Sequence, residues 1–322
     1  MTNNLFIQAF TEPSGVVDSG VRPLPPGVNF WSAPGVVLYT GPGGTAVDAS
    51  TYVPNNAECP IQVFVHDNYA HVDEQIPYLF VEVWVCDPAT IVGPDAGLKV
   101  AQGSSTTPLT ANSTSSGFVT PILVGGFDPY PGMSTQPGGH ACLFANVYGS
   151  KNASGSPITD GQSLIGSSAN IPNLVQTDGH VAQHNIFAKA MTGSSKRHLS
   201  FPFKAVAALR KGEEKVTLEI RNTTEDGGLT ENDLAFLRTG PFKPLQLHPS
   251  KIPLTAFAIE GLPGGPAKSA SMELQAGHPL PLGILVETGP GEHQGAVHTF
   301  NVTQRNQAGQ VQGGIRLLAI TA

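Results

Sequence analysis

Residues 140–147, with the sequence HACLFANV, constrain the fold more than any other stretch. Cys142, Phe144 and Asn146 point to one face of an extended chain, and apolar residues point to the other face. Apolar residues on both faces at a period of two predict a strand that is covered on both sides. Residues 78–86 (YLFVEVWVC) predict a second strand of the same quality. We expect these two strands to pair at the centre of a sheet.

Composition extends this expectation to the whole chain. The chain has 322 residues, with 37 Gly, 28 Pro and only 13% charged residues. Many turn residues and almost no helical periodicity predict an all-β protein. Its length is enough for about two domains, each with its own core. The fold class that we predict is therefore all-β, with two Ig-like β-sandwich domains in tandem and an N-terminal extended arm.

Charge and aromatic usage place the domain boundaries. Residues 1–194 carry 4 Lys and Arg against 13 Asp and Glu, which gives −9, and residues 195–322 carry 13 against 11, which gives +2. Both Trp and all six Tyr precede residue 150. We predict an arm over 1–27, a first sandwich with long loops over 28–194, and a second, smaller sandwich over 195–322. The acidic first region and the weakly charged second one disfavour nucleic acid as a partner.

Within the first domain the strands are read from apolar alternation between turn signals. Pro121 places its strand at a sheet edge or a bulge, because proline cannot donate to a ladder. Two Ser-, Thr- and Gly-rich stretches, 101–117 and 149–170, are predicted as surface loops. Besides the two central strands, strands are predicted over 5–10 in the arm, and over 30–39, 59–66, 118–124 and 181–188.

Three cysteines are too few for a disulfide scaffold. The sandwich topology places Cys59, Cys86 and Cys142 near one end of the domain. Two interpretations remain open. A Cys59–Cys142 disulfide would join the two sheets in an oxidising compartment, whereas three buried thiols are the alternative, which we favour slightly because one cysteine is left over either way.

Four stretches of the first domain resemble a known family. They are Trp31 to Pro34 (WSAP), 81–88 (VEVWVCDP), 139–145 (GHACLFA) and 178–185 (DGHVAQHN). Their order and spacing are similar to bacterial Ig-like modules of the cell-adhesion-related, CARDB-like type, over about residues 28–190. The resemblance implies a β-sandwich associated with adhesion and protein interaction, and it implies no catalytic residues.

The second domain shows the same kind of pattern. Residues 215–222 alternate apolar and polar, which predicts a half-buried strand. Thr230 and Asp233 form a start resembling a capping box, so a short helix is predicted over 229–237. Further strands are predicted over 252–259, 269–274 and 280–287. A terminal hairpin is predicted from 298–304, a turn at 306–309 and 311–320.

One polar loop carries several side chains that could bind a metal ion. His66, His71, Asp73 and Glu74 lie in one polar loop, and two imidazoles with carboxylates can hold zinc or a similar ion. The loop lacks a rigid ligand spacing, and a solvated acidic loop is the more common interpretation. His180 and His184 flank a predicted strand; we interpret them as structural, although metal binding is the alternative. We predict no cofactor.

Other catalytic patterns are missing from the sequence. It contains no G-x-S-x-G motif, and the Gly-rich stretch 261–269 lacks the second Gly and the Lys of a P-loop. The rigid loop 127–132 carries Phe127 and Tyr130, which we predict to be contact residues for a protein or a glycan. The scattered aromatic residues would form a sugar-stacking face only if they gathered on one surface; sandwich-core positions are the favoured alternative. These are Trp31, Tyr39, Tyr52, Tyr69, Tyr130 and Tyr148.

We therefore predict a non-enzymatic structural or adhesive protein that acts through protein–protein contacts, as a homo-oligomer or in a larger assembly such as a filament or array. The alternatives are a carbohydrate-binding module and a metal-dependent hydrolase. No membrane-spanning stretch is visible. Residues 1–7 lack the cationic start and long apolar run of a signal peptide. We expect an extracellular or cell-surface location reached without such a peptide; a cytoplasmic or virion component is the alternative.

Overall fold

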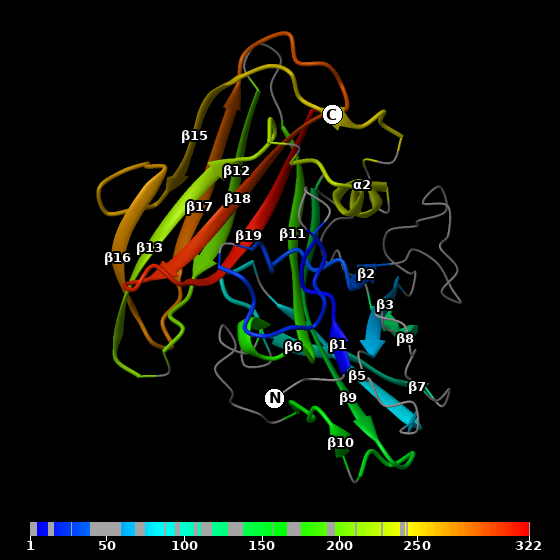
Figure 1. Cartoon of the computed structure of the whole chain (residues 1–322). Helices are drawn as coiled ribbons and strands as arrows, with labels where there is room; N and C mark the ends of the chain where they lie inside the picture. Colours follow the sequence, from blue (N-terminus) through cyan, green and yellow to red (C-terminus); the bar gives the residue numbers. More distant parts are fainter. Residues whose placement is uncertain are drawn as a thin grey trace. The chain divides into compact units, whose positions relative to one another are not determined.

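The structure is a computed structural model. It describes residues 5–11, 16–26, 28–38, 59–67, 75–86, 88–93, 97–105, 109–110, 118–127, 138–156, 158–165, 175–191, 197–209, 211–226, 228–238, 242 and 244–321. These residues form an almost entirely β protein, which confirms the predicted all-β class (Figure 1). The chain divides into two compact units. Unit 1 comprises residues 1–86, 92–129 and 142–184, and unit 2 comprises residues 87–91, 130–141 and 185–322.

The first sheet of unit 1 is built on β5 (Tyr78–Cys86) and β9 (Gly138–Ser150). They pair antiparallel, with Val81 opposite Val147 and Val85 opposite Leu143, which confirms the predicted central pair. On its other side β5 pairs with β6 (Gly97–Ser105). Seven of the nine β5 residues, among them the charged Glu82, are buried. The apolar residues on both faces of β5 and β9 therefore form the core of this sheet.

A second sheet in unit 1 surrounds β3 (Cys59–Asp67). β3 pairs with β1 (Leu5–Ile7), with β2 (Val36–Leu38) and with β8 (Phe118–Phe127), always antiparallel. β8 has a strand partner on one side only among the described residues, so Pro121 lies on an edge strand as predicted. The arm packs along its own unit, because Ile7 N donates to Gly179 O and Leu24 N donates to Gln176 O.

Two loop predictions in unit 1 were wrong in part. β6 continues to Ser105 and β7 (Leu109–Thr110) pairs with β4 (Gln75–Ile76), so the predicted loop 101–117 begins as strand. β10 (Ile158–Asp160) interrupts the predicted loop 149–170 and pairs with the end of β9. Backbone hydrogen bonds build these strands without a run of alternating apolar side chains, which is why a Ser- and Gly-rich composition concealed them.

The larger sheet of unit 2 has the strand order β16-β13-β18-β19-β11 (Figure 1). β18 and β19 form the predicted hairpin, closed by a bond from Gly309 N to Asn306 O. β13 is half-buried, as its alternation predicted, and β19 is buried throughout. The bounds are β11 (Val181–Met191), β13 (Glu213–Asn222), β16 (Ser269–Gln275), β18 (Ala296–Asn306) and β19 (Val311–Thr321).

A smaller sheet completes unit 2. β17 (Leu280–Thr288) lies between β12 (Arg197–Ala205) and β15 (Leu254–Glu260). β14 (His248–Pro249) pairs in parallel with β18, and α2 (Glu231–Arg238) is the predicted short helix. The boundary between the units falls inside β11, after His184. The predicted domains 28–194 and 195–322 are unbroken stretches of chain, whereas each compact unit combines separate stretches.

Candidate functional site

The predicted metal loop is only partly within the described residues. His66 lies in β3 and its ring stacks on Phe6, with 4.9 Å between the ring centroids. Burial lowers the pKa of His66 and outweighs the opposite effect of the Asp18 charge. His71, Asp73 and Glu74 lie outside the described residues. In the part of the chain that the structure describes, no three His, Cys, Asp or Glu side chains gather as metal ligands would. The metal site remains a prediction.

His180 is held between two carboxylates. Its Nδ1 is 2.6 Å from Asp178 Oδ1, and its Nε2 is 3.0 Å from Asp160 Oδ1. Burial alone would lower the pKa of His180, but the hydrogen bonds and charges of both carboxylates raise it to about 9. The second oxygen of Asp160 accepts from Leu5 N at 2.8 Å. This buried imidazolium therefore links β10, the start of β11 and the arm, which is a structural task.

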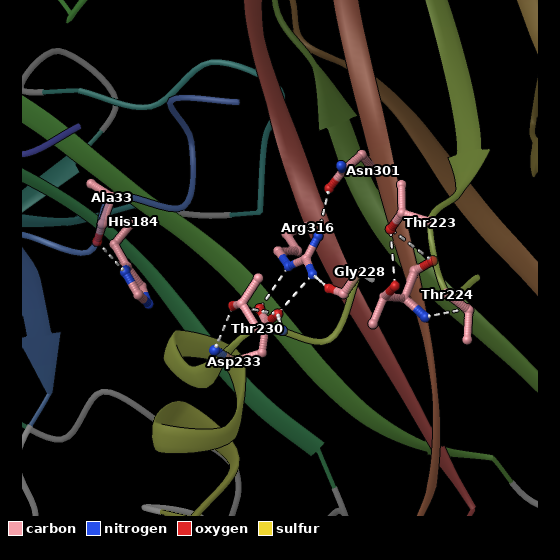
Figure 2. Close-up of polar contacts among 10 residues, drawn as sticks. Ala33, His184, Thr223, Thr224, Gly228, Thr230, Asp233, Asn301 and Arg316 are labelled. Atoms are coloured by element: carbon pink, nitrogen blue, oxygen red, sulfur yellow. Dashed lines mark hydrogen bonds and ion pairs between the residues drawn. The ribbon is translucent and has the colours of Figure 1, made fainter. Parts of the chain in front are cut away.

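His184 has a separate role from His180. It is buried in β11, and its Nδ1 lies 3.1 Å from Ala33 O, as Figure 2 shows. The two histidines thus bind different neighbours.

Glu82 is a buried carboxylate in the centre of β5. It accepts hydrogen bonds from Asn146 Nδ2 at 3.0 Å, from Leu164 N at 2.9 Å and from Ser163 Oγ at 2.6 Å. Asn146 lies directly opposite Glu82 in the register of β9. Three donors satisfy this carboxylate internally, so it joins the sheet to the segment that follows β10. Two polar residues at matching positions of two buried strands were the sequence signal for this pair.

A buried ion pair of unit 2 anchors α2 to β19. Arg316 Nε lies 2.6 Å from Asp233 Oδ1, and its Nη2 lies 2.7 Å from Oδ2 (Figure 2). The guanidinium also donates to Gly228 O and to Asn301 Oδ1. Asp233 and Thr230 exchange the predicted capping-box hydrogen bonds at the start of the helix. Sequence reasoning found the cap but not the arginine.

Two further polar clusters of unit 2 contain groups used in catalysis elsewhere. Ser250 Oγ donates to Glu292, whose other carboxylate oxygen is 3.0 Å from His298 Nε2. Because the serine contacts the carboxylate and not the imidazole, the histidine is not placed to remove its proton.

In the other cluster Thr90 Oγ1 donates to the amide oxygen of Gln304 at 2.6 Å. A chain of amides continues through Gln312 to Glu214.

The predicted contact residues Phe127 and Tyr130 lie at and beyond the end of β8. Phe127 ends β8 opposite Cys59, but its side chain and all of Tyr130 are outside the described part. Of the proposed stacking aromatics, Trp31 and Tyr148 are buried, and Tyr148 stacks on Phe80 at 5.1 Å. These two rings belong to the core and offer no face to a sugar. The other four aromatic residues of that set are outside the described residues.

The three cysteines lie on three strands. Cys86 ends β5 and Cys142 lies in β9; both are buried, and neither is part of a disulfide in the structure. Cys59 begins β3, but its side chain is outside the described part. The Cys59–Cys142 disulfide remains a prediction.

Comparison with known proteins gives no family. No protein-family model and no curated protein matches the sequence. Among solved structures, a Mobiluncus mulieris adhesin with disulfide, isopeptide and ester cross-links is 8% identical, with a TM-score of 0.25, over 89% of this chain and 98% of the adhesin. The collagen adhesin of S. aureus is 8% identical over 82% and 87%, with a TM-score of 0.17. The Streptococcus agalactiae serine-rich repeat protein Srr2 is 9% identical over 90% and 93%, with a TM-score of 0.18.

Identities and TM-scores this low assign the chain neither a family nor a partner. The resemblance to CARDB-like modules also remains a prediction. Among the described residues, no helix combines the length and the apolar character needed to cross a membrane.

Proposed function

We propose that this chain is a non-enzymatic structural or adhesive protein that acts at a cell surface through protein–protein contacts, including contacts between its own copies. The polar clusters described above support this proposal. Their imidazole, carboxylate and guanidinium groups are buried and bind neighbouring segments of the chain. Groups engaged in this way hold a fold together, so the activity is expected at the surface.

The observation that carries the proposal is the outer edge of β16. Ile220 N of β13 donates to Lys268 O, so the even-numbered residues of the strand turn their backbone groups toward β13. The odd-numbered residues turn theirs outward. At Ala267, just before β16, the backbone N–H and C=O on this outer edge still exchange hydrogen bonds with Ile259 of β15. Beyond that point, among the described residues, no strand pairs with the outward backbone groups of Ser269, Ser271 and Glu273.

This edge lacks the features that protect exposed strands from pairing. β16 contains no Pro and no Lys, and its register with β13 is regular. Its only charge is Glu273. Native edges are usually blocked by prolines, lysines or bulges, and an open regular edge is a template for another strand. β16 is therefore suited to strand addition.

The partner that fits this edge best is β16 of a second copy. A two-fold axis at Ser271 places Ser271 opposite its own copy and Glu273 opposite Ser269. The only acidic side chain then meets a neutral partner and not a like charge. On the inner face Ala270 meets Met272. Antiparallel pairing in this register would form about six backbone hydrogen bonds from the outward groups of the two edges.

Charge substitutions at the axis test this contact. Ser271→Lys and Ser271→Glu each place like charges opposite one another, so each variant should sediment as a monomer where the native chain is dimeric. Mixing the two variants should restore the dimer. As the matched control, Ser269→Lys would lie opposite Glu273 and should strengthen association. A native chain that stays monomeric over the whole concentration range of a sedimentation-equilibrium experiment would contradict self-association.

The wider proposal of surface adhesion is tested separately. Antibody labelling of intact cells should detect the protein on the outside, and the purified chain immobilised on beads should bind cells or other copies of itself. Labelling only after the cells are broken would contradict a surface role, whatever the behaviour of β16.

A further inference from the structure

Cys86 and Cys142 occupy matching positions on neighbouring strands. The register of β5 with β9 places Trp84 opposite Phe144 and Val85 opposite Leu143. Continued by one residue beyond this last pair, the register would place Cys86 opposite Cys142. The sequence suggested a cluster of cysteines at this end of the domain, but it did not identify these two as direct cross-strand neighbours.

On this face of the sheet, the side chains that precede the two cysteines contact each other across β5 and β9. Phe80 stacks on Tyr148 with 5.1 Å between ring centroids, and Glu82 accepts a hydrogen bond from Asn146. The Trp84 and Phe144 rings lie 5.8 Å apart. Side chains of a strand alternate between faces, so Cys86 and Cys142 share the face of these pairs.

This placement suits a disulfide. Opposite residues of an antiparallel pair have Cα atoms about 4.5–5.5 Å apart. A disulfide accepts Cα separations of about 4.4–6.8 Å, so the backbone spacing of such a pair permits the bridge once the two Cβ atoms approach to about 4.5 Å. Cys86 is 3% exposed and Cys142 is 0% exposed. A bond at this depth would be shielded from reductants once the sheet has formed.

Other uses of these cysteines are less consistent with their surroundings. Cys86 Sγ donates to Gly93 O at 3.5 Å, and the neighbouring ring pair is Trp84 with Phe144. Burial among apolar groups disfavours a reactive thiolate. Within the described residues, no cluster of three or more potential ligands makes them part of a metal site.

We propose that Cys86 and Cys142 form a disulfide when the chain folds in an oxidising medium. Each thiol loses its proton, and the two sulfur atoms form one S–S bond. The two electrons reduce a low-molecular-weight disulfide, such as oxidised glutathione, to two thiols. Because both sulfur atoms are buried in the folded chain, the exchange takes place while β5 and β9 assemble. The bridge then fixes the central strand pair of unit 1.

The experiment counts thiols in the full-length chain folded with a mixture of reduced and oxidised glutathione. The protein is unfolded in denaturant with excess iodoacetamide and weighed by mass spectrometry. We expect one alkylated cysteine, Cys59, and a proteolytic peptide pair that joins Cys86 to Cys142. Reduction before alkylation should give three alkylated cysteines. The oxidised chain should also melt about 5–10 °C above the reduced chain.

Variants separate the competing pairings. Cys59→Ala should leave no alkylated cysteine and retain the bridge, and this variant changes neither strand of the central pair. Cys142→Ser should leave two alkylated cysteines if it folds. Three alkylated cysteines after oxidative folding would overturn the proposal, as would a peptide pair joining Cys59 to Cys142 or a disulfide between two chains.

Discussion

His180 is the residue whose charge contributes most clearly to stability. Its pKa is raised to about 9 in the folded chain by Asp160 and Asp178, against about 6.5 in an unfolded chain. A raised pKa stabilises the folded state fully below about pH 6.5, less as the pH rises, and not above about pH 9. We expect the free energy of unfolding to fall by about 2–3 kcal/mol between pH 6 and pH 9.5.

Urea denaturation at several pH values measures this slope. His180→Asn removes the titrating group, so its stability should be lower at pH 6 and should no longer show this fall between pH 6 and pH 9.5. The exposed His278 provides the control, because His278→Asn should keep the slope of the native chain. An unchanged slope in His180→Asn would show that other groups cause the pH dependence.

At the residue scale, the sequence was a better guide to what a histidine does in the fold than to which residues it contacts. It predicted structural roles for His180 and His184, and the contacts of both fit this interpretation. It did not reveal that Asp160, 20 residues before His180, supplies the second carboxylate. A short strand in a Ser- and Gly-rich segment brings Asp160 there. Periodicity within single segments carries no information on such a pairing.

At the scale of elements, apolar alternation was the reliable guide. It predicted β5, β9, β13 and the β18–β19 hairpin, whose inward residues form the cores. It missed β12, although Leu199, Phe201, Phe203 and Ala205 alternate with exposed residues. Pro202 broke the pattern, yet a proline is accepted where its missing N–H faces away from the ladder. The parallel pairing of β11 with β19 depends on the whole chain and has no local signature.

We predict that the stability of unit 2 depends on Arg316, which holds helix α2 to β19. Arg316→Met leaves the Asp233 carboxylate, which is 1% exposed, without its cation. Breaking one side of a buried ion pair costs about 3–5 kcal/mol. We expect unit 2 to lose stability by about this amount in chemical denaturation. The matched control is Arg221→Met, whose pair with Asp226 is exposed and should cost less than about 1 kcal/mol.

If Arg316→Met unfolds the chain outright, Arg316→Met combined with Asp233→Leu removes both charges and should recover part of the loss. A double variant less stable than the single one would show that Asp233 contributes more through the hydrogen bonds it accepts from Thr230, which the single variant retains, than its unpaired charge costs.

At the scale of the whole molecule, two modes of self-association predict different assemblies, an open polymer and a closed dimer. The opposed charges of residues 1–194 and 195–322, −9 and +2, favour head-to-tail contacts. Such contacts generate open polymers when the rotation between copies does not close. Pairing of two β16 edges about a two-fold axis closes after two copies. A chain that uses both would link dimers into longer assemblies, which is the arrangement expected of a filament or array.

Salt separates the two modes. The screening length falls from about 30 Å at 0.01 M to about 8 Å at 0.15 M, so contacts between net charges weaken while strand pairing through backbone hydrogen bonds persists. In sedimentation velocity we expect large species at 0.01 M salt that reduce to dimers at 0.15 M, and Ser271→Lys to remove the dimers that persist at 0.15 M. Large species that persist at 0.15 M in the Ser271→Lys variant would contradict both modes, because neither net charge nor the β16 edge could then hold the copies together.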